Sequence, residues 1–338
     1  MKTAVVILNW NTRQYLQQFL PGLVESVRGM DAEVVVADNA SEDGSLDLVR
    51  ELFPDVRRIS LDRNYGFTGG YNRALAQVQA EYFVLINSDI EVDKGWLGPL
   101  EQWMDSHPEC GACGPKLLSY YQRDRFEYAG AAGGLMDRWG YTYCRGRIMG
   151  RTAQDKGQYD SPASVMWVTG ACLMVRSSLW KKLGGLDDRF FAHMEEIDFC
   201  WRAQLAGHEV WTVPEAVVWH IGGGTLSPAS PLKLKLNYRN SEWMLRKNLP
   251  ATLGPRKARA RIAVRRLIDF GTQVAYLLQG KFPYVRAVSE ARREASRRQV
   301  VPTEAGAKVA LSKVRIILAW AFKGKKVFDY LRRYESSN

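Results

Sequence analysis

The first ninety residues alternate between short apolar runs rich in Val and Ile and longer stretches with helical character. The apolar runs show little polar alternation, which is typical of strands covered on both faces and therefore of a parallel sheet. Parallel strands need crossover connections, and the intervening helices supply them. The sequence predicts strands at 4–8, 33–37, 56–61 and 82–86, and helices at 15–27, 45–53 and 69–79. This order indicates one half of a doubly wound α/β fold.

Asn or Asp side chains follow each of these four predicted strands. In open parallel sheets, ligands bind beyond the carboxyl ends of the strands. Asn and Asp also favour turns for local reasons, but their presence after all four strands predicts a ligand site at this edge. The side chains concerned are Asn9 and Asn11, then Asp38 and Asn39, then Asn64, and finally Asn87, Ser88 and Asp89.

Beyond residue 92 the pattern is looser and richer in Gly, Tyr and Arg. We expect a helix near 96–104, a strand-like run over 165–175 that is interrupted at 169–171, and a helix over 190–205. Two short strands are expected at 211–214 and 216–220. The helix over 190–205 carries three acidic residues near its start, flanked by aromatic residues that favour burial.

The cysteines and the N-terminus both favour a cytoplasmic protein. The five cysteines are an odd number and are scattered, as expected of free thiols in a reducing compartment. Cys110 and Cys113 form a single CxxC, which fits either a redox or zinc half-site or two small buried residues. The apolar run at 4–8 is too short for a signal sequence, and no stretch approaches the length of a membrane span.

The positive charge of the chain lies in its C-terminal part. Of the net charge of +11, residues 251–338 contribute 20 Lys and Arg against 6 Asp and Glu, whereas residues 1–250 are close to neutral. Helical periodicity in this segment sets apolar and aromatic faces against basic faces. Such helices suit an anionic membrane surface. They also suit a bundle packed on the main domain with a solvated basic face. Nucleic acid is a third alternative, although no recognition motif is present.

Several short motifs, taken in order, resemble glycosyltransferase family 2, and most of all its bacterial rhamnosyltransferase-like branch. The similarity covers about residues 2–250 and rests on the order and spacing of the motifs together. They are LNWN at 8–11, VADNAS at 36–41, RNYGF at 63–67, LINSD at 85–89, VTGAC at 168–172, FFAHMEEIDFCWR at 190–202 and VVWH at 217–220.

The resemblance implies a GT-A fold, with a nucleotide-binding half at 1–92, an acceptor-binding half at 93–250 and a basic helical extension at 251–338. It implies an inverting hexosyltransferase that uses a UDP- or dTDP-sugar, with dTDP-rhamnose as one candidate. The acceptor would be a hydroxyl of a glycan or of a polyprenyl-diphosphate-linked sugar in cell-surface polysaccharide synthesis. Such an enzyme would lie peripherally on the cytosolic face of the inner membrane.

The resemblance also assigns the donor site. Asp38 is expected to accept the N3–H of a uracil or thymine base, and Asn9 to line the same pocket. Residues 87–89 replace the DxD motif of the family, but the first acid is an amide. Asp89 is therefore the one acidic ligand for Mn²⁺ or Mg²⁺, with His220 as a second ligand. The other residues expected along the nucleotide sugar are Asn11, Asn64, Gly66, Asn72, Asn87 and Ser88.

For the catalytic base, the resemblance points to Glu196, with Glu195 as the second choice. An inverting transfer needs a carboxylate that takes the proton of the attacking hydroxyl, and Glu196 stands where the family usually has Asp. The residues expected on the acceptor side are Thr169, Gly170, Asp198 and Trp201, with a structural role as the alternative for Asp198.

Two other classes of protein are alternatives to this interpretation. A Rossmann-type oxidoreductase or methyltransferase predicts a glycine-rich fingerprint after the first strand, and residues 9–13 contain no glycine. A non-catalytic glycan- or membrane-binding protein on a transferase scaffold would be consistent with the missing first acid of the DxD and with Glu at position 196.

Overall fold

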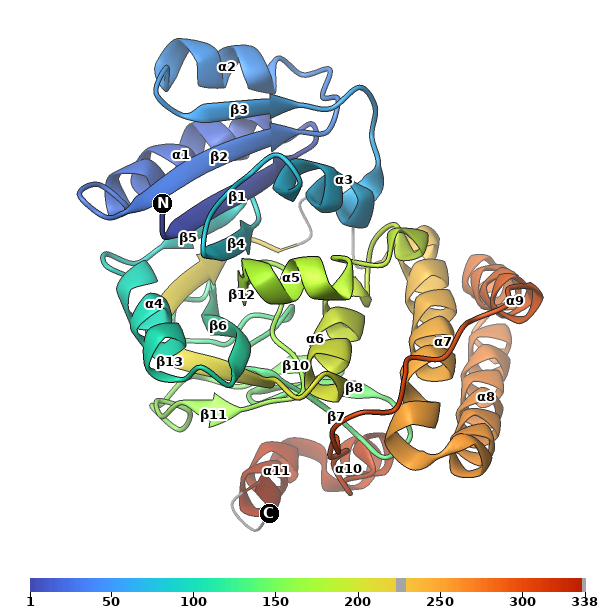
Figure 1. Cartoon of the computed structure of the whole chain (residues 1–338). Coiled ribbons are helices and arrows are strands. Elements are labelled where there is room, and N and C mark those ends of the chain that lie inside the picture. The colour runs from blue at the N-terminus through green and yellow to red at the C-terminus, as the bar shows by residue number, and fades with distance from the viewer. Residues whose placement is uncertain (223–228, 336–338) are drawn as a thin grey trace.

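The computed structural model of the chain describes residues 1–222 and 229–335. Within them, the strands form a nine-stranded sheet with helices on both faces and a smaller four-stranded sheet (Figure 1). The strands are β1 (Thr3–Asn9), β2 (Ala32–Asp38), β3 (Arg57–Ser60), β4 (Tyr82–Ile86), β5 (Ile90–Val92), β6 (Cys110–Ser119), β7 (Gly134–Met136), β8 (Thr142–Cys144), β9 (Arg147–Ile148), β10 (Arg151–Thr152), β11 (Ala163–Ser164), β12 (Cys172–Arg176) and β13 (Glu209–His220).

The large sheet has the order β11-β13-β6-β12-β4-β1-β2-β3, with β5 paired to β13, and the small sheet has the order β10-β9-β8-β7. The helices are α1 (Arg13–Ser26), α2 (Ser45–Leu52), α3 (Gly66–Leu75), α4 (Leu97–Ser106), α5 (Ser177–Leu183), α6 (Glu195–Leu205), α7 (Pro231–Leu253), α8 (Pro255–Leu278), α9 (Phe282–Arg297), α10 (Ile316–Lys323) and α11 (Val327–Glu335), with 3₁₀ turns at Asp188–Phe190 and Gly324–Lys326.

The first four strands and three helices confirm the predicted α/β alternation. β1 pairs in parallel with both β2 and β4, and β2 pairs in parallel with β3. Alternate residues of β1 point to opposite faces of the sheet, and both sets are buried. Val5 and Ile7 belong to the core shared with α1 and α2, whereas Ala4 and Val6 belong to the core shared with α3. Burial on both faces is why these strands are apolar at nearly every position.

The second half of the sheet differs from the prediction. The run expected as a strand over 165–175 becomes a strand only at Cys172, where β12 pairs antiparallel with β4. The two strands expected at 211–214 and 216–220 are one strand, β13. Its register against β6 shifts between Val213 and Val217, a bulge that accommodates Pro214. The helix expected from residue 190 begins at Glu195.

Helix α7 crosses the boundary expected at residue 250 and runs through Pro250 to Leu253. Trp243 and Leu249 on α7 belong to the same hydrophobic cluster as residues of β1 and β4, and this cluster extends along the chain to Val309. None of the described helices combines the length and the apolar character that a membrane span requires. Cys110 and Cys113 are buried in β6 as free thiols, in agreement with the interpretation as small core residues.

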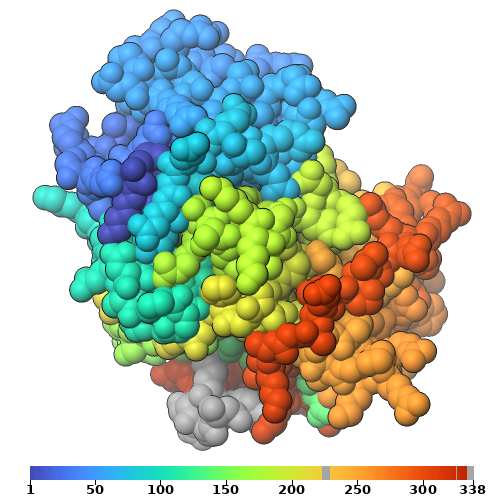
Figure 2. All heavy atoms as spheres, in the orientation of Figure 1, coloured from blue at the N-terminus to red at the C-terminus, as the bar shows by residue number. Residues whose placement is uncertain are grey.

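After α9 the chain crosses the surface beside α7 and returns to the main domain (Figures 1 and 2). The N–H of Thr303 donates to the carbonyl of Lys247 (2.8 Å), and the N–H of Ala307 donates to the carbonyl of Leu205 (2.9 Å). Beyond this crossing, Ile316 and Val327 form a small core with Tyr143 and other residues of the four-stranded sheet. One face of the basic extension is therefore packed on the rest of the protein.

This packing predicts that the end of the chain contributes to stability. Ile316 is 1% exposed and Phe322, on the same helix, is 81% exposed. Replacing Ile316 by Ala should lower the free energy of unfolding by about 2–4 kcal/mol because a buried side chain is lost. The matched change Phe322→Ala should alter it by only about 0.5 kcal/mol. Denaturant unfolding of both variants measures the difference, and equal stabilities would mean that the extension is not packed as described.

Candidate active site

The polar residues at the ends of β1 and β2 meet at one edge of the sheet. Asn9 is fully buried, and its amide donates to a carboxylate oxygen of Asp38 (2.9 Å) and to the hydroxyl of Ser41 (3.0 Å). The other oxygen of Asp38 accepts the backbone N–H of Ser41 (2.9 Å). These contacts fix the carboxylate of Asp38 in the position where the sequence predicts a base-binding acceptor.

The end of β4 is joined to this cluster through hydroxyl groups. The Oγ1 of Thr12 lies 2.8 Å from the Oγ of Ser88 and also contacts the amide oxygen of Asn9. Asn11 adopts a left-handed conformation (φ 53°), and its side-chain oxygen accepts the backbone N–H of Glu42 (2.8 Å). The structure thus brings these strand-end residues into one hydrogen-bonded edge.

Asn64 and Gly66 join the donor edge to the turn before α6. The amide oxygen of Asn64 accepts N–H groups from Asn39 (3.0 Å) and from Gly66 (2.8 Å). Gly66 has a φ of 70°, and a Cβ there would lie 2.5 Å from the ring of Phe191, so only glycine fits. The carbonyl of Phe191 accepts the N–H groups of Phe67 and Thr68 at the start of α3. These two amides of α3 are therefore satisfied within the protein.

Asn72 does not belong to the donor edge. Its amide nitrogen donates to the carbonyl of Leu186 (2.7 Å) and to the carboxylate of Asp188, and its oxygen accepts the N–H of Leu186 (2.9 Å). Because these contacts engage both the nitrogen and the oxygen of the amide, we assign Asn72 the role of holding the loop before α6 rather than of binding the nucleotide sugar.

Asp89 and His220 lie together, as expected of residues that share one ligand. Asp89 Oδ1 is 3.2 Å from His220 Nε2, and both side chains are buried. The amide nitrogen of Asn87 is 3.4 Å from the same ring nitrogen. On the other side of the ring, His220 Nδ1 is 3.2 Å from a carboxylate oxygen of Glu127.

The two carboxylates determine the charge of His220. Burial disfavours the imidazolium, but the contacts with Asp89 and Glu127 outweigh burial and raise the pKa of His220 to about 10. Burial likewise raises the pKa of Asp89, and His220 more than reverses this, so the pKa lies below its ordinary value. A carboxylate oxygen and an imidazole nitrogen are both ligands of Mn²⁺. Among the described residues no group of three His, Cys, Asp or Glu side chains is arranged to hold a metal ion.

The turn before α6 is held in an unusual backbone conformation. Phe191, His193 and Met194 all have positive φ values, between 65° and 74°, which non-glycine residues rarely adopt. The amide nitrogen of Asn240, which is buried on α7, lies 2.8–3.0 Å from the carbonyl oxygens of residues 190, 192 and 193. Its two N–H bonds are shared among three acceptors, so Asn240 holds the turn in place from the side of α7.

Glu195 and Glu196 follow this turn directly. Each has one carboxylate oxygen that is buried without a hydrogen-bond partner in the described part of the chain. Burial is the main cause that raises the pKa of both, and for Glu196 it raises the pKa to about 7. A Cβ at Gly170 would lie 3.5 Å from the Cβ of Glu196, so the absence of a side chain keeps that approach open. A carboxyl group of this kind can exchange a proton near neutral pH.

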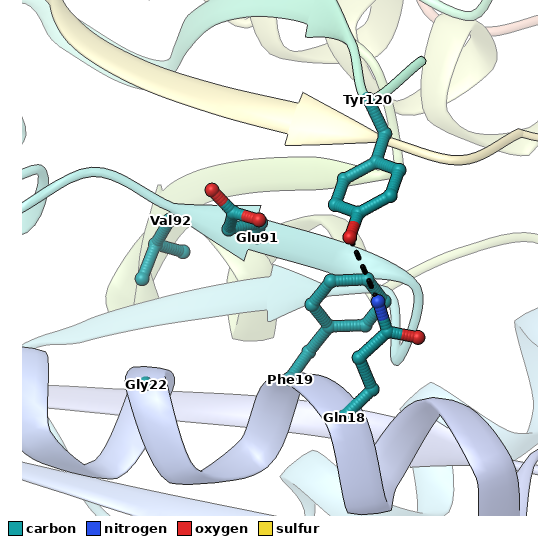
Figure 3. A pocket seen from close by; sticks show the side chains of 6 residues that line it. All are labelled: Gln18, Phe19, Gly22, Glu91, Val92 and Tyr120. Atoms are coloured by element: carbon teal, nitrogen blue, oxygen red, sulfur yellow. Dashed lines mark hydrogen bonds between the residues drawn. The ribbon is translucent and has the colours of Figure 1, made fainter.

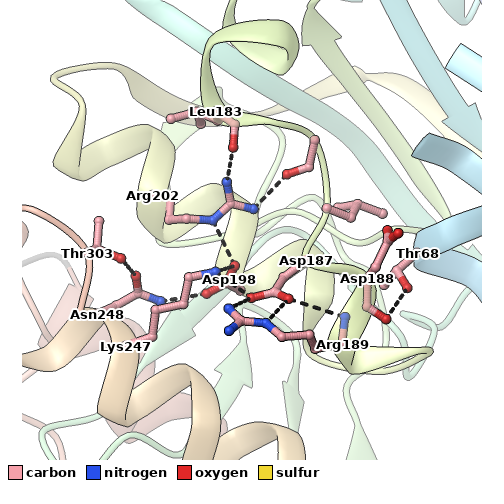
Figure 4. A network of polar contacts seen from close by, with 12 residues as sticks. Thr68, Leu183, Asp187, Asp188, Arg189, Asp198, Arg202, Lys247, Asn248 and Thr303 are labelled. Atoms are coloured by element: carbon pink, nitrogen blue, oxygen red, sulfur yellow. Dashed lines mark hydrogen bonds and ion pairs between the residues drawn. The ribbon is translucent and has the colours of Figure 1, made fainter. Parts of the chain in front are cut away.

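Asp198 and Trp201, both expected on the acceptor side, lie in the core instead. The carboxylate of Asp198 accepts hydrogen bonds from Arg202 (2.8 Å), Lys247 (2.9 Å) and Asn248 (2.8 Å), as Figure 4 shows. Trp201 is fully buried, and its indole N–H donates to the hydroxyl of Thr252 (2.9 Å). Neither side chain is accessible to an acceptor substrate. We therefore assign Asp198 the structural role that the sequence analysis gave as its alternative.

The hydroxyl group of Thr169 is also engaged in a hydrogen bond within the protein. Its hydroxyl accepts the N–H of Ala171 (3.2 Å), and the carbonyl of Ala171 in turn accepts the N–H of Asn87 (2.9 Å). Thr169 and Gly170 therefore connect the segment at 87–89 with the position of Glu196.

A hollow of about 310 Å³ lies between α1 and β5 (Figure 3). Its side chains are Gln18, Phe19, Gly22, Glu91, Val92 and Tyr120. Gln18 donates to the hydroxyl of Tyr120 (2.9 Å), and Glu91 is engaged by Arg123. None of the residues predicted for the donor or acceptor lines this hollow, so we do not assign it to either substrate.

Two residues that contact the site were not predicted from the sequence. Glu127 lies in the irregular region after β6 and follows no periodic pattern, and Asn240 lies on a helix far along the chain. The motifs that carry the resemblance to a known family do not include these positions, so the sequence contained no signal that identified them.

Comparison with known proteins identifies the class. Residues 4–183 match the glycosyl transferase family 2, so the chain belongs to this family and is a glycosyltransferase. This confirms the family that the sequence motifs predicted, and it excludes the oxidoreductase and methyltransferase alternatives.

The chain is also similar to individual members of that family. It is 28% identical over 231 residues to the N-acetylglucosaminyl-diphospho-decaprenol L-rhamnosyltransferase of Mycobacterium tuberculosis, covering 64% of this chain and 75% of that protein. It is 25% identical over 234 residues to the O-antigen biosynthesis protein RfbC of Myxococcus xanthus, covering 68% of this chain but 18% of that protein.

Solved structures confirm the GT-A fold. S. aureus TarS 1–349 in complex with UDP-GlcNAc aligns with a TM-score of 0.57 at 17% identity, covering 100% of this chain and 91% of that one. The mannosyltransferase PcManGT from Pyrobaculum calidifontis in complex with GDP-Man and Mn²⁺ aligns with a TM-score of 0.54 at 14% identity, covering 98% and 84%.

The contacts of Asn240 predict a measurable contribution to stability. Asn240→Leu keeps the volume but removes the side-chain donor from the carbonyl groups of Ala192 and His193, whereas the carbonyl of Phe190 keeps Arg239 as a donor. This loss should lower the free energy of unfolding by about 2–4 kcal/mol. Asn237→Leu, on the same helix at a half-buried position, serves as the matched control and should change it by about 0.5 kcal/mol. If both variants unfold alike in denaturant, Asn240 does not hold the turn.

Proposed function

We propose that the protein is an inverting glycosyltransferase that moves a sugar from a UDP- or dTDP-sugar to a hydroxyl of a glycan or lipid-linked acceptor. The observation that carries this proposal is Glu196, which has a buried carboxylate oxygen without a partner among the described residues and a raised pKa. It follows a turn that also contacts the donor half of the protein through the carbonyl of Phe191. A general base held at the donor site is what a single displacement requires.

In this reaction the acceptor hydroxyl oxygen attacks the anomeric carbon as the bond from that carbon to the nucleoside diphosphate breaks. Glu196 takes the hydroxyl proton, and the configuration at the anomeric carbon inverts. Asp38 and Asn9 bind the base of the nucleotide, and the strand-end hydrogen bonds keep both side chains oriented. The negative charge that develops on the leaving diphosphate needs a positive partner at the same edge.

Asp89 and His220 are the residues that would hold a divalent cation, Mn²⁺ or Mg²⁺, against the diphosphate. The donor set fits such an ion, because phosphate oxygens would complete a shell begun by one carboxylate and one imidazole. The cation would neutralise charge on the leaving group. Because His220 is protonated when held between two carboxylates alone, binding of the cation would displace that proton. The mannosyltransferase PcManGT, which was solved in complex with GDP-Man and Mn²⁺, supports this assignment.

We place the reaction in cell-surface polysaccharide synthesis, with a polyprenyl-diphosphate-linked sugar as acceptor, on the cytosolic face of the inner membrane. The names of the mycobacterial and myxobacterial relatives support the acceptor class. The outward face of the extension supports contact with an anionic membrane, because apolar residues are exposed there among basic ones. The exposed apolar residues of α8 and α9 are Leu267, Phe270, Val274, Leu277, Leu278 and Phe282.

The assignment of the base predicts a pH profile. With a pKa near 7, Glu196 is deprotonated above that pH, so kcat/KM should fall as the pH drops through about 7. Glu196→Gln should lower kcat by at least about 100-fold while nucleotide binding persists. Glu51→Gln, at an exposed position on α2, should leave turnover unchanged. Normal turnover in Glu196→Gln, with loss in Glu195→Gln, would transfer the role to Glu195.

The metal assignment predicts linked binding of nucleotide and cation. UDP or dTDP with Mn²⁺ should raise the melting temperature by about 5 °C at saturating concentration. Asp89→Asn should remove the part of this rise that depends on Mn²⁺, whereas Asp47→Asn, an exposed residue paired with Arg50, should not. If no nucleotide raises the melting temperature with any divalent cation, the proposed donor chemistry is wrong.

A further inference from the structure

Arg147 is a buried cation without a counter-ion among the described residues. It lies on β9, its side chain is 7% exposed, and its Nε has no hydrogen-bond acceptor there. Two other described arginines are buried to a similar degree. Arg202 pairs with Asp198 at 2.8 Å and Arg265 pairs with Asp269 at 3.0 Å. Of the ion pairs that residues 1–222 and 229–335 form, none involves Arg147.

Such an arrangement is costly in the substrate-free protein. A guanidinium taken out of water loses hydration, and in protein interiors this loss is normally compensated by a carboxylate. Arg202 and Arg265 follow that rule, and both stabilise contacts between helices and loops. Arg147 departs from the rule, because the groups that interact with it are the thiol of Cys144 and, beyond ion-pair distance, Glu196. Neither is a carboxylate in contact with the guanidinium, so paired N–H donors of Arg147 are left for a group outside the chain.

The position of Arg147 identifies where that group binds. Its guanidinium carbon lies 4.9 Å from the ring centre of Tyr128, the residue that follows Glu127. Glu127 contacts His220, and His220 contacts Asp89. The positive charge of Arg147 also lowers the pKa of Glu196, although burial dominates there. Arg147 therefore lies on the wall of the active site, near both the predicted cation ligands and the predicted base.

We propose that Arg147 binds phosphoryl oxygens of a substrate. The planar guanidinium presents paired N–H donors that match two oxygens of a phosphate, and it keeps its charge at any physiological pH. Two substrates of the proposed reaction carry such a group: the nucleoside diphosphate of the donor and the diphosphate of a lipid-linked acceptor. The inference rests on the proposed function, and the chemistry that it assigns to Arg147 is the same for both sources.

The first measurement concerns stability without any substrate. Arg147→Met replaces a buried, unpaired cation by an apolar side chain of similar length, so the melting temperature should stay the same or rise. An arginine with a structural role would behave in the opposite way, as Arg202→Met should, because that change removes one of the two cations that pair with the buried Asp198. A fall in the melting temperature of Arg147→Met comparable to that of Arg202→Met would overturn the proposal.

The second measurement separates the two sources of phosphate. Calorimetry gives the Kd of UDP and of dTDP in the presence of Mn²⁺, and turnover gives KM for two acceptors, N-acetylglucosaminyl-diphospho-farnesol and octyl N-acetylglucosaminide. If Arg147 binds the donor, Arg147→Met should raise the nucleotide Kd about tenfold or more. If it binds the acceptor, the nucleotide Kd stays constant and KM rises by a similar factor for the diphosphate acceptor alone.

Further variants keep the result interpretable. Arg147→Lys keeps the charge but loses the paired donors, so it should recover part of the affinity. Arg145→Gln is the matched control, because Arg145 lies on the same hairpin but stacks on Tyr159, and it should leave every constant unchanged. If folded Arg147→Met keeps the wild-type nucleotide Kd and both KM values, the proposal is wrong. If the wild-type protein itself binds no nucleotide, it is the proposed function that fails.

Discussion

The arrangement of the active site depends on one strained turn, residues 190–194. The carbonyl of Phe191 accepts the first amides of α3, so the donor half is attached to the turn. Asn240 holds the turn from the side of α7, and Glu195 and Glu196 begin α6 immediately after it. Backbone in this conformation costs about 1–3 kcal/mol per residue, and the hydrogen bonds from α3 and α7 offset that cost. Three segments far apart in the sequence thereby fix the carboxylates relative to the nucleotide site.

The sequence predicted the fold best where the signal was local. Strands β1 to β4 are buried on both faces, so nearly every position is apolar and the crossover helices are implied. Predictions failed where tertiary packing overrode a local signal. Two strands were expected at 211–214 and 216–220, but a single strand continues through a bulge at Pro214. A domain boundary was expected at residue 250, but α7 continues to Leu253 and its apolar side is packed in the main core.

The difference between local sequence signals and tertiary packing also explains which residues of the site were predictable. Strand-end residues were predictable because parallel strands bring their carboxyl ends to one edge. Within the acidic motif, an α-helix that starts at the site presents only its first turn there. Asp198 and Trp201 lie farther along α6 and therefore enter the core, although they belong to the same motif as Glu196. Glu127 and Asn240 reach the site from distant segments through tertiary packing alone, as Arg147 does in our proposal, and a single sequence carries no spacing that identifies them.

Two groups of buried charged residues lie close to α6. The residues of one group are paired with each other and stabilise the fold, whereas those of the other group lack such partners and are candidates for a role in the reaction. Asp198 is surrounded by Arg202, Lys247 and Asn248, so its charge is compensated within the protein and the network stabilises the fold at all times (Figure 4). Glu195, Glu196 and Arg147 have no partner at ion-pair distance among the residues that the structure describes, although the charge of Arg147 favours the ionised form of Glu196. In the proposed reaction, a substrate hydroxyl or phosphate would supply the missing partner. Groups held ready in this way need little reorganisation when charge develops during the reaction, which is the basis of electrostatic catalysis.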